Sequence, residues 1–314
     1  MAAANMDFCA KFSESTGKSL QKDVSLREFS HFRIGGTADY FFEALSASEL
    51  STAICLARDY QTPFYVIGGG FNILFADEGY RGLILKNSVQ GITKLKDSEI
   101  EVYSGTPIHE VLHFCTENSQ SGLEFMAGIP GTVGGAVFGN AGAFEQNIGA
   151  CLHRATILDS ENNTIEVDNA YFTFSYRHSG LKEKHDVLLK ASFAVKQSKK
   201  EELTKKIQGI LEKRKANHPP WDTACAGSYF KNPIFPNRNK IPAAKLLDKV
   251  GAKGLRVGGA SVYELHANFI INTENASARD VRDLASELKR RVQEEYGIKL
   301  EEEVIYLPEF GTTL

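Results

Sequence analysis

The chain has 314 residues, of which 42% are hydrophobic and 24% are charged, with a formal net charge of -3. This length suits two or three domains, and the near-neutral charge excludes the strongly basic surface typical of proteins that bind nucleic acids or anionic membranes. The five cysteines form no CxxC pair and no apolar stretch reaches membrane-spanning length, so we expect a cytoplasmic protein without disulfides or a metal site.

In chain order, residues 1–24 are polar and are expected to be frayed. From 25 to 197, strand and helix patterns alternate, which indicates an α+β or α/β domain. Ser46 and Glu49 form a capping box that predicts a helix, and Thr106 in front of a proline predicts the cap of another. Strands are predicted at 38–43, 63–70 and 82–86, and in three runs between 151 and 195.

A charged helix within residues 198–219 ends at two consecutive prolines, and we interpret it as a linker. Residues 220–314 then predict a second, smaller α+β unit. Its longest helix begins at a capping box formed by Ser277 and Asp280. The other elements predicted in this unit are a helix at 242–250 and strands at 267–271 and 303–307.

Two glycine-rich segments, 67–72 and 128–143, are the strongest chemical signal. Clustered glycine lets the backbone approach a ligand closely, and inward-facing N–H groups can hold phosphate oxygens without lysine or arginine. The run Gly68 to Gly70 lacks the third glycine of GxGxxG, and no GxxxxGK[ST] occurs, which disfavours a Rossmann or P-loop site. From these residues alone, phosphate binding and a pair of closely packed turns both remain open.

Three segments, FRIGGTADYFFE (32–43), VIGGGFNILFADEGYRGLIL (66–85) and GLEFMAGIPGTVGGAVFGNAGAF (122–144), resemble the flavin-binding part of the UDP-N-acetylenolpyruvoylglucosamine reductase (MurB) family. The family belongs to the wider group of vanillyl-alcohol-oxidase-like flavoproteins. The resemblance implies a two-lobed FAD-binding module followed by a smaller α+β substrate domain, with FAD bound non-covalently. Phe71 stands where the family usually has serine. The implied flavin contacts are Gly68, Gly69, Gly70, Phe71, Asn72, Gly128, Ile129, Pro130, Gly131, Thr132, Gly135 and Asn140.

Three further segments resemble the family's active-site motifs: FSYRHSGLKE (174–183), AGSYFKNP (226–233) and LEEEVIYL (300–307). The resemblance implies that Arg177 is the active-site arginine, Ser228 the proton donor and Glu303 the catalytic glutamate. Glu302 replaces the family's usual proline. Each residue alone would be an ordinary turn or surface residue, and only their joint occurrence carries the inference. The implied substrate-binding residues are Tyr176, Lys231, Asn232 and His266, although a buried, hydrogen-bonded His266 is an equally open interpretation.

The resemblance implies NADPH-dependent reduction of UDP-N-acetylglucosamine enolpyruvate to UDP-N-acetylmuramate through FAD, a step in bacterial cell-wall synthesis. An arginine can stabilise the charge that develops beside the substrate carboxylate, and a serine hydroxyl can act as the acid if a positive charge or relay assists it. The chain resembles the family form without an extra tyrosine-bearing loop, and we expect a monomer. The alternatives are another FAD-dependent oxidoreductase of this fold, acting on an alcohol or sugar, and a non-catalytic FAD- or nucleotide-sugar-binding protein.

Overall fold

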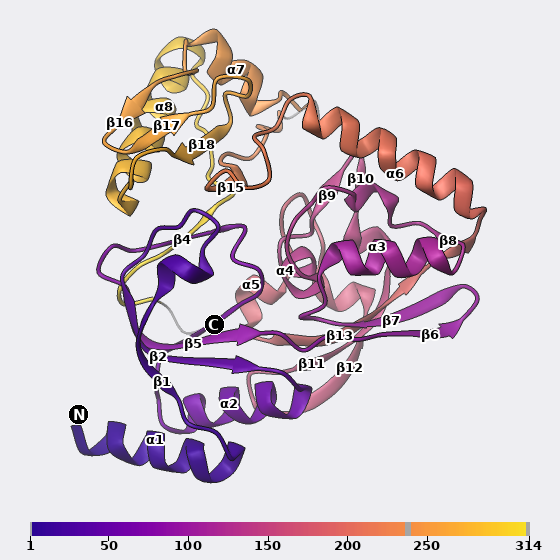
Figure 1. The fold of residues 1–314 in the computed structure, drawn as a ribbon, viewed down its shortest axis with the longest axis vertical. Helices are drawn as coiled ribbons and strands as arrows, with labels where there is room; N and C mark the ends of the chain where they lie inside the picture. The colour runs from indigo at the N-terminus through magenta and orange to yellow at the C-terminus, as the bar shows by residue number, and fades with distance from the viewer. Residues whose placement is uncertain (1, 236–239, 312–314) are drawn as a thin grey trace.

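A computed structural model describes residues 2–235 and 240–311 and shows two α+β lobes, a connecting helix and a C-terminal α+β domain (Figure 1). This arrangement agrees with the fold class expected from the resemblance. No helix among the described residues is both long and apolar enough to cross a membrane.

The first lobe contains a four-stranded sheet in the order β1-β2-β5-β3, in which β2, β5 and β3 are parallel. The helix α2 packs on one face of this sheet, and η1 and β4 lie on the other. The predicted strands at 38–43, 63–70 and 82–86 are therefore confirmed as β2, β3 and β5. The elements of this lobe are α1 (Ala2–Thr16), β1 (Gln21–Ser25), η1 (Leu26–Phe29), β2 (Thr37–Ala44), α2 (Ala47–Asp59), β3 (Phe64–Ile67), β4 (Ile73–Phe75) and β5 (Tyr80–Asn87).

The N-terminal segment is folded, which corrects the expectation of a frayed stretch. Phe8 and Phe12 lie one turn apart on α1 and are 1% and 0% exposed. Their rings pack edge-on against Tyr40 and Phe42 of β2, with centroid distances of 5.8 and 4.9 Å. The apolar stripe is narrow and the surrounding residues are polar, so periodicity alone gave little sign of this helix. Packing against β2 stabilises it instead.

The predicted helix starts have different outcomes. Ser277 and Asp280 form the complete capping box at the start of α8 (Ala278–Tyr296), as expected. At α2, Ser46 accepts from the N–H of Glu49, but the Glu49 carboxylate accepts from the N–H of Leu45 at 2.9 Å. The N-cap is therefore confirmed, whereas the reciprocal bond reaches one residue further back than predicted.

The second lobe contains a five-stranded antiparallel sheet in the order β12-β11-β13-β7-β6, and α3 and α4 pack into the same core. Thr106 does not cap α3, because Pro107 occupies the cap position and the Thr106 hydroxyl bonds to Gly91. The elements of this lobe are β6 (Ile92–Lys96), β7 (Glu99–Tyr103), α3 (Ile108–Glu117), β8 (Gln120–Ser121), η2 (Glu124–Met126), α4 (Val133–Phe138), β9 (Gly142–Ala143), β10 (Gln146–Asn147), η3 (Ile148–Ala150), β11 (Leu152–Leu158), β12 (Thr164–Asp168), η4 (Asn169–Phe172), α5 (Leu181–Lys184), β13 (Val187–Ala194) and β14 (Lys196–Gln197).

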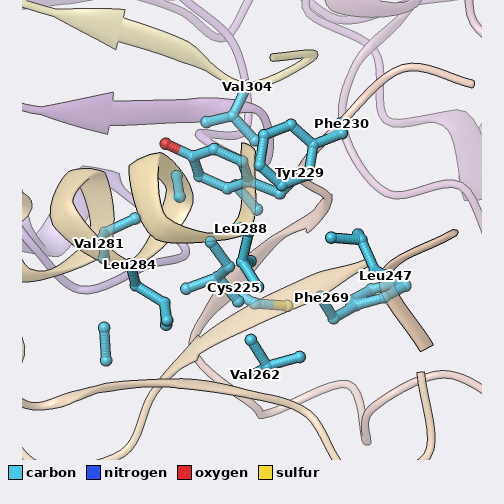
Figure 2. Packing of buried hydrophobic residues seen from close by; sticks show 14 of the residues in the cluster. Cys225, Tyr229, Phe230, Leu247, Val262, Phe269, Val281, Leu284, Leu288 and Val304 are labelled. Atoms are coloured by element: carbon cyan, nitrogen blue, oxygen red, sulfur yellow. The ribbon is translucent and has the colours of Figure 1, made fainter. Parts of the chain in front are cut away.

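The helix α6 (Lys200–Lys215) packs on α3 and η2 and leads to the C-terminal domain (Figure 1). That domain contains a sheet in the order β15-β18-β17-β16, and α8 packs its apolar side against it. Val281, Leu284 and Leu288 are the α8 side chains at the centre of this core (Figure 2). The elements are β15 (Cys225–Ser228), α7 (Ala243–Lys249), β16 (Arg256–Val257), β17 (Ala260–Val262), β18 (Phe269–Asn272), α8 and β19 (Ile305–Leu307).

Contacts at several places join the C-terminal domain to the first lobe. The strand β19 leaves that domain and pairs in parallel with β4. In the other direction, Phe32 and Ile34 of the FRIGG segment are buried in the core of the C-terminal domain. Both ring nitrogens of His31 lie within hydrogen-bond distance of carbonyl oxygens in that domain, those of Cys225 and Trp221. The C-terminal domain is thus fixed against the first glycine-rich segment.

Candidate active site

Arg177 and Glu303 form an ion pair between the second lobe and the C-terminal domain. The distance from Arg177 Nε to Glu303 Oε1 is 2.6 Å, and the two side chains are only 24% and 20% exposed. Glu303 lies next to the AGSYFKNP segment, because its N–H donates to the carbonyl of Tyr229 at 2.8 Å. Ser228 is the preceding residue and ends β15. The structure therefore brings the three predicted catalytic residues into one region.

Arg177 occupies the tip of a tight hairpin. Ser175 and His178 exchange both main-chain hydrogen bonds, at 3.1 and 3.2 Å, which leaves Tyr176 and Arg177 as the turn residues. Arg177 has φ = 56°, in the left-handed region that non-glycine residues seldom adopt. Its Nη1 donates to the carbonyl of Gly142 at 3.0 Å. The guanidinium is thus held on one side by Glu303 and on the other by the glycine-rich segment.

Asn140 supports this hairpin through a side-chain hydrogen bond. Its side chain is buried, and its Nδ2 donates to the carbonyl of Ser175 at 2.7 Å while its Oδ1 accepts from the N–H of Gly149 at 3.1 Å. The Ser179 hydroxyl adds a bond to the carbonyl of Phe138. Asn140 was expected to contact the flavin. In the structure its amide connects the second glycine-rich segment to the Arg177 hairpin, and its contact with the flavin stays a prediction.

Burial raises the pKa of Glu303 above its ordinary value, while Arg177, Lys182 and Lys231 act in the opposite direction. Lys240 adds a further positive charge, with its Nζ 4.3 Å from the centroid of the Tyr176 ring. Several cations therefore surround one largely buried carboxylate. Such a site favours an anionic ligand.

Three of the four predicted substrate-binding residues lie beside this ion pair. The Tyr176 hydroxyl accepts from the N–H of Asn232 at 3.1 Å, and Lys231 pairs with Glu301 at 3.3 Å. The Asn232 side chain also accepts from the N–H of Ala243 and so fixes the start of α7. Tyr176 thus joins the Arg177 hairpin to the C-terminal domain.

His266, the fourth, lies in an aromatic cluster with His218 and Phe269, with ring centroids between 4.8 and 5.5 Å apart. Phe269 is the cross-strand partner of Ser228, so the cluster lies on the serine side of the site. Burial, together with Arg214 and His266, lowers the pKa of His218 to about 4. Nothing in the sequence singles out His218, because a histidine before two prolines matches no metal-ligand or catalytic spacing.

The first glycine-rich segment offers unused main-chain donors. Among residues 2–235 and 240–311, the N–H groups of 69–72 donate to no acceptor. Gly70 has φ = 71°, and a Cβ there would overlap the carbonyl oxygen of Phe29, so only glycine fits. The Asn72 side chain donates to the carbonyl of Glu303 at 3.1 Å. This segment therefore combines free amides with a direct connection to the candidate catalytic glutamate.

A cavity of about 740 Å³ opens beside this segment, and its wall includes Gly68, Gly69 and the basic residues Arg27, Arg33 and Lys86. Free N–H groups together with nearby cations suit the diphosphate of a dinucleotide. The residues present thus fit FAD.

The second glycine-rich segment contacts the first directly, because a Cβ on Gly68 would overlap the hydroxyl of Thr132. Thr132 is the N-cap of α4 and accepts from the N–H of Gly135. Gly131 has φ = 108°, and a Cβ there would meet no heavy atom closer than 4.0 Å, which leaves open space beside the loop. Gly128 lies under the side chain of Arg214. The other predicted contacts in this loop are Ile129, partly buried against the core of the lobe, and the exposed Pro130.

Comparisons with known proteins agree with this geometry. Residues 38–168 match an FAD binding domain, and residues 219–307 match the C-terminal domain of UDP-N-acetylenolpyruvoylglucosamine reductase. The reductase of Caldicellulosiruptor bescii is 40% identical over 303 residues, which cover 96% of this chain and 95% of the relative. The chain belongs to the UDP-N-acetylenolpyruvoylglucosamine reductase family.

Two other members of the family support this assignment. The reductase of Chlamydia muridarum is 37% identical over 92% of this chain and 95% of its own length. The crystal structure of UDP-N-acetylenolpyruvylglucosamine reductase (MurB) from Thermus caldophilus superposes with a TM-score of 0.76 at 30% identity, covering 91% of this chain and 98% of that one.

Both departures from the usual pattern of the reductase family are accommodated locally. Glu302, in the place of proline, forms an ion pair with Lys289 of α8 at 2.6 Å, and the neighbouring Glu303 bonds through its N–H to the carbonyl of Tyr229. Phe71, in the place of serine, packs its ring over Gly69 and lies 4.6 Å from the ring of His31. Within the described part of the chain, its N–H group donates to no acceptor, like the others of 69–72.

Proposed function

We propose that this protein catalyses the NADPH-dependent reduction of UDP-N-acetylglucosamine enolpyruvate to UDP-N-acetylmuramate through FAD, in peptidoglycan precursor synthesis. The observation that carries the proposal is the Arg177–Glu303 ion pair, adjacent to Ser228 and joined through Asn72 to the first glycine-rich segment. An oxidase acting on an alcohol or sugar is not favoured, because such a reaction needs no cationic site for a carboxylate.

The chemistry assigns a role to each of these residues. When bound, FAD carries the hydride that NADPH provides to the terminal carbon of the enolpyruvyl group. Arg177 stabilises the negative charge that develops beside the substrate carboxylate, since a guanidinium stays protonated in any site. Glu303 orients Arg177. Ser228 donates a proton to the carbon next to the carboxylate, which completes the addition of hydride and proton across the double bond.

The charge of the site matches the proposed substrate, which carries a diphosphate and a carboxylate. We assign Lys231 and Lys240 to the diphosphate region, and Tyr176 and Asn232 to positioning the substrate. His266 is assigned to the serine side of the site. The flavin is assigned to the two glycine-rich segments, with Asn140 as a support for the hairpin.

We also propose that the protein is a cytoplasmic monomer with an FAD-binding domain at 25–197, a linker at 198–219 and a substrate domain at 220–314, and that the folded segment before residue 25 forms part of the FAD-binding domain. NADPH is proposed to use the same face as the substrate in turn, which predicts ping-pong kinetics.

The test compares the two half-reactions in Ser228→Ala. NADPH should bleach the flavin of this variant anaerobically at the wild-type rate, whereas the enolpyruvyl nucleotide should restore the colour about 10²- to 10⁴-fold more slowly, as expected on loss of a positioned acid. The control is Ser261→Ala, in the same sheet. Normal reoxidation in Ser228→Ala would remove Ser228 from its role. Failure of the wild-type flavin to be reoxidised by this nucleotide would contradict the function itself.

A further inference from the structure

Lys182, on α5, is a lysine whose amine points into the protein. Its Nζ donates to the main-chain carbonyl of Arg177 at 3.0 Å and lies 5.4 Å from the centroid of the Phe138 ring. Burial lowers the pKa of Lys182, and the charges of Lys231 and Arg177 add to that effect while the Glu303 carboxylate opposes it. Placing an ammonium here costs free energy, so its contacts need an explanation.

The contact of Lys182 coincides with the strained point of the hairpin. A left-handed backbone at a non-glycine residue costs about 1–3 kcal/mol and persists only where the surroundings hold it. This left-handed conformation determines the direction in which the Arg177 carbonyl points. A charge-assisted hydrogen bond to that carbonyl is about twice as strong as a neutral one, and it therefore favours the observed backbone over a relaxed turn.

The direction of the Arg177 side chain depends on the same backbone. Its guanidinium reaches Glu303 and Gly142 from the turn position, and a relaxed φ would turn the Cα–Cβ bond away from both. Asn140 and Ser179 fix the two strands of the hairpin, whereas Lys182 alone among these three binds its tip.

We propose that Lys182 is a positioning residue, whose ammonium holds the strained main chain of Arg177 so that the guanidinium stays on Glu303 and faces the substrate. The role rests on the proposed reductase function. In this role Lys182 acts through Arg177 and does not itself contact the substrate.

Lys184 provides a matched control two residues further on. Its Nζ also donates to a main-chain carbonyl, that of Tyr171 at 2.8 Å, and also lies over an aromatic ring, that of Tyr171. The two lysines thus share a helix, a type of hydrogen bond and a type of ring contact, and only Lys182 binds the Arg177 hairpin.

The experiment measures both half-reactions in Lys182→Met, Lys182→Arg and Lys184→Met. In Lys182→Met, reoxidation by saturating enolpyruvyl nucleotide should slow by about 10- to 100-fold, as expected for a misplaced catalytic group, while NADPH bleaching stays within about threefold of wild type. Lys182→Arg should recover most of the rate, and Lys184→Met should retain it. Unchanged reoxidation in Lys182→Met, or a rise in KM with kcat retained, would overturn the positioning role.

A double-mutant cycle tests whether Lys182 acts through Arg177. In an Arg177→Lys background, the further change Lys182→Met should slow reoxidation by less than about threefold, because the side chain that it positions is already altered. Additive effects of the two substitutions would show that Lys182 acts independently of Arg177 and would contradict the proposal. The wild-type reoxidation measured alongside tests the proposed function separately, so the two failures are distinguishable.

Discussion

The two walls of the candidate active site are held by different forces. The wall from the second lobe is the hairpin of residues 175–178, which depends on polar side chains and places Arg177 in a left-handed conformation. The wall from the C-terminal domain pairs 229–231 with 301–303 through main-chain bonds, next to an apolar core. The polar wall fixes the position of the Arg177 guanidinium, and the apolar wall stabilises the folded domain. Substitutions in the two walls should therefore separate turnover from stability.

The largest expected effect is on the apolar wall. Leu288 is fully buried in the core of the C-terminal domain (Figure 2), and Leu288→Ala should lower the free energy of unfolding by about 2–5 kcal/mol. Leu265→Ala, at a position 63% exposed, should change it by less than about 0.5 kcal/mol. Denaturant titration measures both. If the folded fraction of Leu288→Ala also lost turnover by more than about tenfold at low temperature, the separation between the walls would fail.

The second effect is on the polar wall. Asn140→Ala leaves the carbonyl of Ser175 and the N–H of Gly149 without partners and should cost about 1–3 kcal/mol of stability. Reoxidation of the flavin by substrate should slow by about 100-fold, because Arg177 loses its support. Asn118→Ala removes an asparagine whose amide donates to the carbonyl of Phe114 at the end of α3, and it should affect stability alone. Equal rates in the two variants would break the comparison.

The smallest effect is a pH dependence on the serine side of the site. The folded-state pKa of His218, about 4, lies below its ordinary value of 6.5, so the unfolded chain binds more protons between these pH values. Stability is therefore fully present above pH 6.5 and is lost as the pH falls towards 4. Allowing for the partial exposure of His218, the loss should be about 1 kcal/mol. His218→Gln should flatten this part of the pH profile, measured by denaturant titration, and an unchanged slope would exclude His218 as its source.

Local signals in the sequence predicted much of the fold. The helix α8 followed from a capping box and an apolar stripe, and β2, β3 and β5 from short apolar runs. The resemblance of three distant motifs correctly anticipated that Arg177 and Glu303 meet. In each case, the information lay within a few residues or within a recognisable motif.

The remaining features depend on contacts between distant segments. The N-terminal helix is held by Phe8 and Phe12 on β2, which no local pattern indicates. The engagement of Asn140 with Ser175, and the pairing of β19 with β4, arise only once the chain has folded. The role of Lys182 was equally hidden, because a lysine in a charged stretch is typical of a solvated surface.

The pairing of β19 with β4 constrains how the protein can move. The C-terminal domain is tethered at both of its ends, through α6 and through β19, so it cannot swing as a free flap on one linker. Glu303 lies at the second tether, where Asn72 binds its carbonyl and Ile305 binds that of Asn72. Because Phe32, Ile34 and His31 also hold the domain, the main chain of Glu303 lies within a junction that is anchored on several sides and bonded to the first glycine-rich segment.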